Sequence, residues 1–139
     1  MVDRLSIASA MASSGLEAQS KRLRVIAENI ANSHSTAKVA GGDPYVRKVV
    51  AFSEVLAGET KGVSTKVTAV PPEKSPFPIV HDPANPAADE FGRVKLPNVN
   101  PLVEMADMRE AGNSYDANLQ VIRQSREMVG ELIDLLRGR

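Results

Sequence analysis

The chain has 139 residues, enough for one domain, with no Trp, no Cys, two Tyr and three Phe. Lys and Arg together number 17, as do Asp and Glu, so the formal net charge is zero. A nucleic-acid-binding protein normally presents a basic face, so this balance argues against that class. The absence of Cys excludes disulfides and thiolate chemistry. Because much of the apolar content is Ala, which buries little area, we expect a thin core that depends partly on partners.

Residues 3–32 are predicted to form one helix, since the segment has no Pro and a single Gly. Gly15 is the expected weak point, because Gly is unfavourable inside a helix. The apolar positions are separated by steps of three and four, which is the spacing of a coiled-coil seam. This seam consists of Leu5, Ala8, Ala12, Leu16, Leu23, Ile26 and Ile30, with Gln19 in the remaining place.

Residues 101–137 are predicted to form a second, longer helix. Asn100 is a suitable N-cap, and Pro101 suits the first helical position. A helix of this length in so small a chain is typical of coiled coils and assemblies. Its apolar seam, interrupted at Arg126, consists of Leu102, Met105, Met108, Gly112, Tyr115, Leu119, Ile122, Val129, Ile133 and Leu136.

The region between these helices contains eight of the nine prolines. The segment 45–52 is rich in β-branched and aromatic residues and 63–68 alternates in polarity, so a hairpin is predicted. From 71 to 97 the prolines favour an extended or turning chain. The predicted fold class is therefore mainly α with a small β insert. Its expected parts are a terminal helical assembly domain, formed by 1–32 and 101–139 as a coiled-coil-like layer, and a β-containing middle region, 33–100, with a Pro-rich extended segment.

Catalytic and metal-binding patterns are weak in this sequence. His81, Asp82 and Asp89 could suggest a metal or acid–base site, but their spacing matches no common ligand pattern. Turns formed by Asp-Pro and Asn-Pro explain these residues better. There is neither a Gly-rich phosphate loop nor a nucleophile elbow. We therefore predict a protein that is not an enzyme and has no cofactor, no metal site and no small-molecule substrate.

The most specific motifs of the chain are not catalytic, and they follow one another in a fixed order. They are Ala27–Asn32 (AENIAN), Gly41–Arg47 (GGDPYVR), Asp82–Gly92 (DPANPAADEFG), Leu96–Pro101 (LPNVNP), Glu104–Met108 (EMADM) and Ser114–Asn118 (SYDAN). In this order and spacing, over nearly the whole chain, they resemble the rod proteins of the bacterial flagellar basal body.

The resemblance implies a structural subunit of the proximal rod, needed for flagellum-dependent motility. In that family the terminal helices form the inner layer of an axial tube that transmits torque. The implied partners are copies of the chain, other flagellar rod proteins and the membrane-ring and export-gate base, with no nucleic acid. The implied location is the periplasmic rod, reached through type III export without a cleaved signal peptide. Conventional signals alone would leave the chain in the cytoplasm, since the N-terminus has no apolar run of signal-peptide length.

Residues expected at the assembly interface come from the two seams and from the motifs. They are Leu5, Ala12, Leu16, Leu23, Ile26, Asn29, Ile30, Asn32, Met105, Met108, Tyr115, Asn118, Leu119 and Ile122. For Tyr115, packing within the chain is equally compatible with the pattern, and for Leu119 and Ile122 it is favoured. An alternative function is a soluble helical regulatory module whose two helices form a groove for one defined partner. A hydrolase using His81, Asp82 and Asp89 is a third, weaker alternative.

Overall fold

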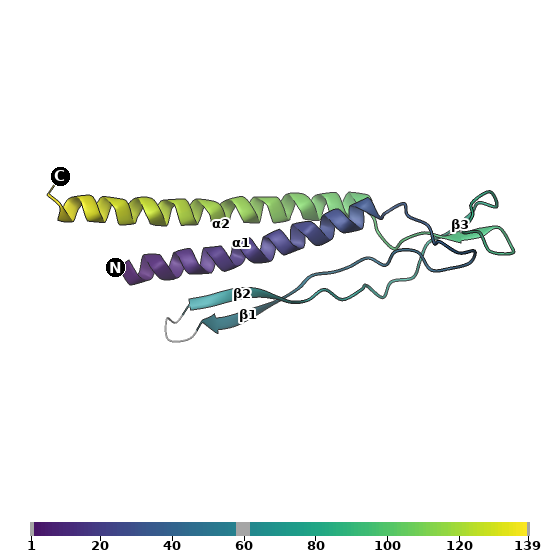
Figure 1. Ribbon diagram of the computed structural model, residues 1–139, viewed down its shortest axis with the longest axis horizontal. Coiled ribbons are helices and arrows are strands. Elements are labelled where there is room, and N and C mark those ends of the chain that lie inside the picture. Colours follow the sequence, from purple (N-terminus) through teal and green to yellow (C-terminus); the bar gives the residue numbers. More distant parts are fainter. Residues whose placement is uncertain (1, 58–61, 139) are drawn as a thin grey trace. The chain divides into compact units, whose positions relative to one another are not determined.

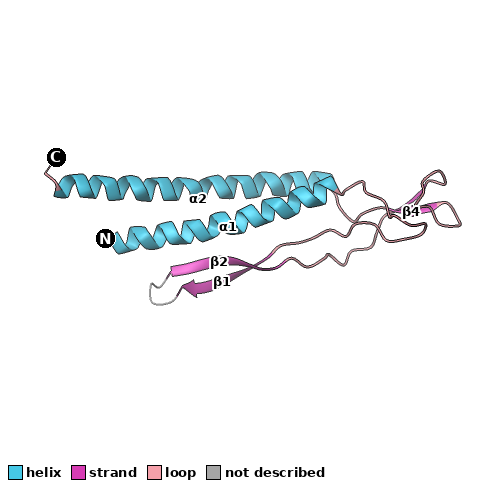
Figure 2. Cartoon of the chain, in the orientation of Figure 1, coloured by secondary structure: helices cyan, strands magenta, loops and turns pink. Residues whose placement is uncertain are grey.

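A computed structural model of the chain describes residues 2–57 and 62–138. Its elements, coloured by type in Figure 2, are α1 (Val2–Ala31), β1 (Ala51–Ala57), β2 (Gly62–Ala69), β3 (Ile79–His81), β4 (Arg93–Lys95) and α2 (Pro101–Leu136). Both predicted helices are confirmed to within one residue at each end. The fold is mainly α with a small β insert, as predicted. No helix of the described chain has a segment apolar enough to cross a lipid bilayer.

Side chains at the helix ends explain where α1 stops and α2 starts. The Asn100 side-chain oxygen accepts the Leu102 N–H at 3.0 Å, and Pro101 occupies the first helical position. These contacts confirm the predicted N-cap, because the cap oxygen satisfies an N–H that has no partner inside the helix. At the end of α1, Asn32 donates from its backbone N–H and from its side-chain amide to the Glu28 carbonyl, at 3.1 and 2.9 Å. Asn32 therefore terminates α1 as predicted.

The chain divides into two compact units. The first unit comprises Met1–Leu23, Ala51–Ala69 and Glu110–Arg139, and the second comprises Arg24–Val50 and Val70–Arg109. This division runs through both helices instead of separating the helices from the middle region. The assignment of the terminal helices to a separate assembly domain stays a prediction.

Within the first unit, α1 and α2 lie alongside each other (Figure 1), and small residues line the contact. Ala111 is 0% exposed, and a Cβ added to Gly15 would lie 2.8 Å from the Asn118 amide nitrogen. Arg22 pairs with Glu110 at 3.4 Å. Gly15 and Arg22 thus face α2, one position before the Leu16 and Leu23 of the predicted seam, which are half-buried. Gly15 is not a break in α1; it permits close approach of the Asn118 side chain.

The hairpin of β1 and β2 lies beside α1 in the same unit (Figure 1). The two strands are antiparallel, with Phe52 opposite Val67. Ser14 of α1 accepts the Thr65 N–H of β2 through its hydroxyl at 3.3 Å. The predicted hairpin is confirmed, although Gly58, expected to flank its turn, lies outside the described residues.

The first hairpin strand begins later than predicted. The segment 45–50 is extended, but only an isolated bridge between Lys48 and Pro72 joins it to the chain opposite. Pro71 and Pro72 have no N–H to donate, so a continuous ladder cannot form there. The strand over Tyr45–Phe52 was therefore wrong in its position, and the ladder starts at Ala51.

The second unit holds a short strand pair that the sequence did not reveal, within the segment expected to be extended or turning. β3 and β4 pair antiparallel, and the turn between them is closed by Asp89, whose carboxylate accepts the N–H groups of Phe91 and Arg93 at 2.9 and 2.8 Å. These bonds, the one from Arg93 foremost, lower the pKa of Asp89 below its usual value. Gly92 follows with φ +71°, which favours Gly. The prediction that turn formation explains Asp89 is confirmed.

The contact between Gly15 and Asn118 makes a testable prediction. Replacing an ordinary helical Gly by Ala stabilises a helix by about 1 kcal/mol. We expect that gain for Gly112→Ala, because an added Cβ there meets nothing within 4 Å. At Gly15→Ala the gain should be absent, because the Asn118 amide has to move away. Urea unfolding of both variants measures the difference.

The Asn118→Ala background provides the control. There Gly15→Ala should stabilise the chain as much as Gly112→Ala does. An equal gain at both glycines in the unmodified background would show that Asn118 does not crowd Gly15.

Candidate functional site: a buried polar cluster and exposed apolar rows

Asn29 is the most completely bonded polar side chain of the second unit. It is 1% exposed and lies inside α1. Its amide nitrogen donates to the Lys48 carbonyl at 2.9 Å and to Glu104 at 3.0 Å. Its amide oxygen accepts the Lys48 N–H at 3.0 Å and the Tyr45 hydroxyl at 2.9 Å. Two donors and two acceptor positions are the full capacity of an Asn side chain, so none is left unsatisfied.

Glu104 lies opposite Asn29 on α2 and is also 1% exposed. One carboxylate oxygen accepts the Asn29 amide, and the other accepts the Arg47 Nε at 2.5 Å. A buried carboxylate is costly unless a cation and hydrogen bonds compensate its lost hydration. Arg47 and Asn29 supply both.

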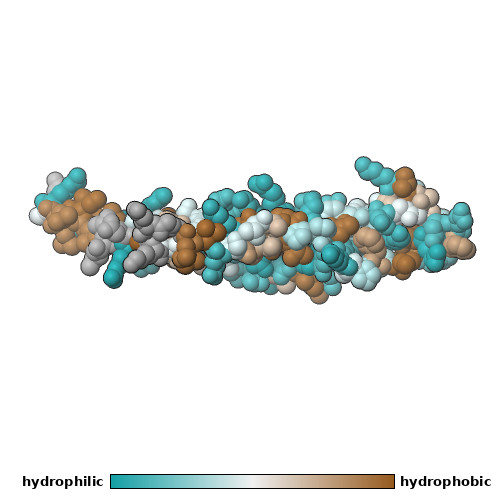
Figure 3. Space-filling model, turned by 90° about the horizontal axis from the view of Figure 1, so that it is seen from below, coloured by the Kyte–Doolittle hydropathy of each residue, from teal (hydrophilic) through white to brown (hydrophobic). Residues whose placement is uncertain are grey.

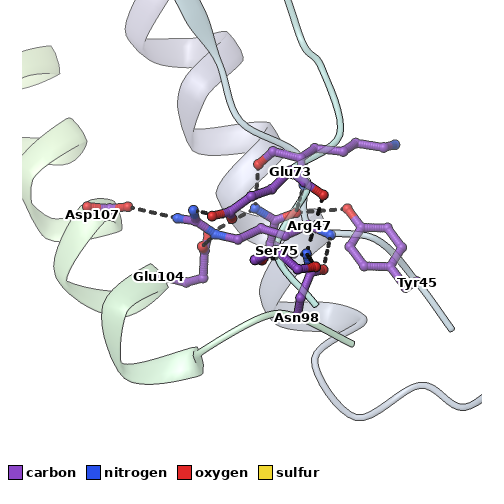
Figure 4. Close-up of polar contacts among 9 residues, drawn as sticks. Tyr45, Arg47, Glu73, Ser75, Asn98, Glu104 and Asp107 are labelled. Carbon is purple, nitrogen blue, oxygen red and sulfur yellow. Dashed lines mark hydrogen bonds and ion pairs between the residues drawn. The ribbon is translucent and has the colours of Figure 1, made fainter. Parts of the chain in front are cut away.

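Arg47 extends these contacts to two further carboxylates (Figure 4). Its Nη1 lies 2.8 Å from Glu73, and its Nη2 lies 3.5 Å from Asp107. Burial opposes the charge, but the hydrogen bonds to Glu73 and Glu104 outweigh it and raise the pKa of Arg47. The backbone of Arg47 is held as well, because its N–H donates to the Asn98 side chain at 2.7 Å.

The edge of this polar cluster is closed by three further contacts. Asn98 donates to the Ser75 hydroxyl at 2.9 Å (Figure 4). Lys48 pairs with Glu28 of α1, and its ammonium lies 5.8 Å from the centre of the Tyr45 ring. We define the polar cluster as Glu28, Asn29, Tyr45, Arg47, Lys48, Glu73, Ser75, Asn98, Glu104 and Asp107.

The chemistry of the cluster is structural. Its hydrogen bonds connect α1, the extended segment 45–50 and the start of α2 within one unit. Among residues 2–57 and 62–138, no group of three or more His, Asp or Glu is placed to hold a metal ion. His81, Asp82 and Asp89, the weak hydrolase candidates, belong to β3 and its turn, where Asp89 bonds to backbone.

The predicted interface residues fall into three groups. Ala12, Ile26 and Asn29 are buried within the chain itself, and their place at a contact with a neighbour stays a prediction. Met105 is 60% exposed. The others are half-buried and stay predictions: Leu5, Leu16, Leu23, Ile30, Asn32, Met108, Tyr115, Asn118, Leu119 and Ile122.

Two features escaped the sequence reasoning. Arg47 and Glu104 stand inside the GGDPYVR and EMADM motifs, but nothing in the sequence pairs residues so far apart. The predicted seam of α2 included four residues of its two exposed apolar rows but omitted Val103 and Leu135. The row at its start is Leu102, Val103 and Met105, and the row at its end is Ile133, Leu135 and Leu136.

Two long helices, two small strand pairs and a fully bonded polar cluster define a helical scaffold protein. Comparison with known proteins agrees. Residues 10–37 match the family model described as "Flagella basal body rod protein", and residues 92–135 match "Flagellar basal body rod FlgEFG protein C-terminal".

Curated relatives named flagellar basal-body rod protein FlgC are similar over almost the entire chain. The protein of Agrobacterium fabrum is 54% identical, with 99% of each chain covered. That of Salmonella typhimurium is 40% identical, covering 90% of this chain and 92% of its own. That of Bacillus subtilis is 33% identical, covering 90% and 93%. The chain belongs to the FlgC family of flagellar basal-body rod proteins, which are structural rod subunits and not enzymes.

The burial of Asn29 predicts that it contributes far more to stability than Asn32, a residue of the same type on the same helix end. Asn29→Ala leaves one buried carboxylate oxygen of Glu104 and the Lys48 N–H without their hydrogen bonds, and we expect a loss of about 3 kcal/mol or more. Asn32→Ala removes a single side-chain bond to the Glu28 carbonyl and should cost about 1 kcal/mol. Urea unfolding compares the two, and equal losses would contradict the cluster's importance.

The environment of Tyr45 predicts that its hydroxyl ionises, and the chain loses stability, only at strongly alkaline pH. Burial, followed by the charge of Glu28, raises the pKa of Tyr45 from 10.0 to about 12. Because the folded pKa lies above the unfolded one, its stabilising contribution is complete below pH 10 and is lost as pH rises towards 12. Absorbance of the phenolate should show this late ionisation, and Tyr45→Phe should remove it. Ionisation of Tyr45 near pH 10 in the folded chain would contradict it.

Proposed function

We propose that this chain builds the proximal part of the rod through its terminal helices, which pack as a coiled-coil-like layer against copies of itself and other rod proteins. The observation that carries this proposal is the exposure of large apolar side chains on α2. Leu102, Leu135 and Leu136 are 77%, 72% and 88% exposed. Figure 3 shows the apolar surface gathered over the C-terminal end of α2. Contiguous exposed apolar groups on a monomer mark interaction sites.

The first unit also offers a place where a neighbour could bind. A groove of about 360 Å³ lies between α1 and α2, with Leu5 and Val129 on its walls and Ser9 and Ser125 beside them. Its lining is mainly apolar and contains small residues, so another helix can approach closely. Because the exposed leucines of α2 and the lining of this groove are both apolar, the leucines of one subunit suit the groove of another.

Rod assembly explains how modest contacts would carry torque. Each exposed row buries limited area, but many subunits acting in parallel add these contacts together. The further parts of the proposal are a periplasmic location, type III export without a cleaved signal peptide, and contact with the membrane-ring and export-gate base. The similarity of nearly the whole chain to FlgC proteins supports them. The alternative of a regulatory module with one partner is not favoured, since that similarity leaves no separate region for it.

Substitution of the C-terminal row tests the proposal. Leu135→Ser combined with Leu136→Ser should leave folding unchanged, because both side chains are already in water, but should abolish rod assembly and swimming. Motility in soft agar and recovery of the chain in purified basal bodies are the measurements. Val39→Ser, at another exposed apolar residue, serves as the matched control and should swim normally.

Export must be measured beside assembly, since a chain that stays in the cell also fails to build a rod. The amount of the double variant secreted by a strain that cannot complete the rod should equal that of the unmodified chain. Basal bodies that contain normal amounts of the double variant, with normal swimming, would overturn the proposal.

A further inference from the structure

The small residues at the contact between α1 and α2 in the first unit do not by themselves select one alignment of the two helices, and the Arg22–Glu110 pair adds little because Glu110 is largely exposed. Gly15 faces Asn118, and the positions seven residues before and after Asn118 are Ala111 and Ser125. Both alternatives are as small as Asn118 or smaller. A slip of one heptad would place either of them opposite Gly15 without a clash, since a seven-residue step preserves the face of a packed helix.

The contact in the second unit follows the same alignment. Asn29 lies 14 residues after Gly15, and Glu104 lies 14 residues before Asn118. The two pairs are thus separated by the same number of residues along each helix, so their sequence positions are compatible with a single pairing scheme. Unlike the small seam residues, Asn29 and Glu104 are chemically specific for each other.

A slip would break this specific pair in either direction. If α2 moved by one heptad one way, Asn29 would face Ala111, which cannot accept its amide hydrogen. If it moved the other way, Asn29 would face Pro97, before the first residue of α2. In both cases a buried amide loses its carboxylate, and Arg47, held at its guanidinium by Glu73 and at its backbone N–H by Asn98, no longer meets Glu104.

We propose that the Asn29–Glu104 contact, held in place by Arg47, determines the register in which α1 and α2 pair. A single polar layer in an otherwise permissive helix seam is a known means of fixing alignment, because misaligned states bury unpaired polar groups. The role of the layer is thus specificity: it fixes which side chains of α2 remain exposed. The proposal rests on contacts within the chain and does not depend on rod assembly.

Disulfide trapping tests this inference directly, because the chain contains no Cys. Three double variants carry Gly15→Cys with Asn118→Cys, Ala111→Cys or Ser125→Cys. A heptad slip moves a partner by about 10 Å, beyond the reach of a disulfide. In the native background the pair with Asn118→Cys should oxidise at least about tenfold faster than the other two. Dilute protein on non-reducing gels ensures that only intramolecular bonds are counted.

The polar layer is then replaced by apolar side chains, Asn29→Leu with Glu104→Leu, in each of the three Cys double variants. We expect the tenfold preference to fall to near one, with helical circular dichroism retained. Glu104→Gln keeps an acceptor for Asn29 and should keep the preference. Ile26→Ala weakens the buried core without touching the layer, so it separates loss of stability from loss of register.

Two outcomes overturn the proposal. One is an undiminished preference for Asn118→Cys after the apolar replacement. The other is an equal loss of preference in Ile26→Ala, which would assign the register to general packing. Should the double Leu variant not fold, Asn29→Asp decides. The carboxylate introduced at position 29 repels Glu104 in the native register only. The preference for Asn118→Cys must therefore fall if the layer sets the alignment.

Discussion

The burial of one carboxylate, that of Glu104, is the constraint on which the second unit depends. A charged group removed from water has to meet a cation and hydrogen-bond donors, or it destabilises the fold. Arg47 supplies the cation from the extended segment after Gly41, and Asn29 supplies the donor from α1. Once these three groups meet, the path of residues 45–50 is fixed along the end of α1. The Lys48 backbone, bonded to Asn29 in both directions, follows from the same meeting.

In the first unit the two helices meet mainly through small residues and not through a buried polar cluster. Its helix contact is made of Ala, Gly and Ser, which bring the backbones close but bury little apolar area per residue. Several large apolar side chains of α2, among them Leu102, Leu135 and Leu136, are exposed instead. A single chain therefore gains modest stability from its helix pair and retains an apolar surface. This distribution suits a subunit whose neighbours complete the core, since the same residues cannot serve both contacts.

Local signals were sufficient to predict the helices and their caps. Asn100 and Asn32 act through bonds to residues two and four positions away, and Pro101 acts through its own fixed φ, so the sequence carries the whole cause. The polar cluster was out of reach, because Arg47 and Glu104 are 57 residues apart and Asn29 and Glu104 are 75 apart. The predicted seam includes Ala12 and Ile26, which are buried, but it omits Gly15 and Arg22. Gly15 approaches Asn118 closely and Arg22 pairs with Glu110, and neither contact follows from a pattern of apolar residues.

The two units therefore combine complementary physical roles in one pair of helices. A seam of small residues is permissive, and a layer of buried polar residues is selective. Either alone would serve assembly poorly. Apolar rows recognise a neighbour only if they point in the same direction in every copy, and a one-heptad slip would move the exposed leucines of α2 by about 10 Å along α1. A subunit that repeats along a rod cannot tolerate that variation, since errors in alignment add from copy to copy. Asn29 and Glu104 are buried within the chain, and through the alignment of the helices they would still affect how the exposed rows meet a neighbour.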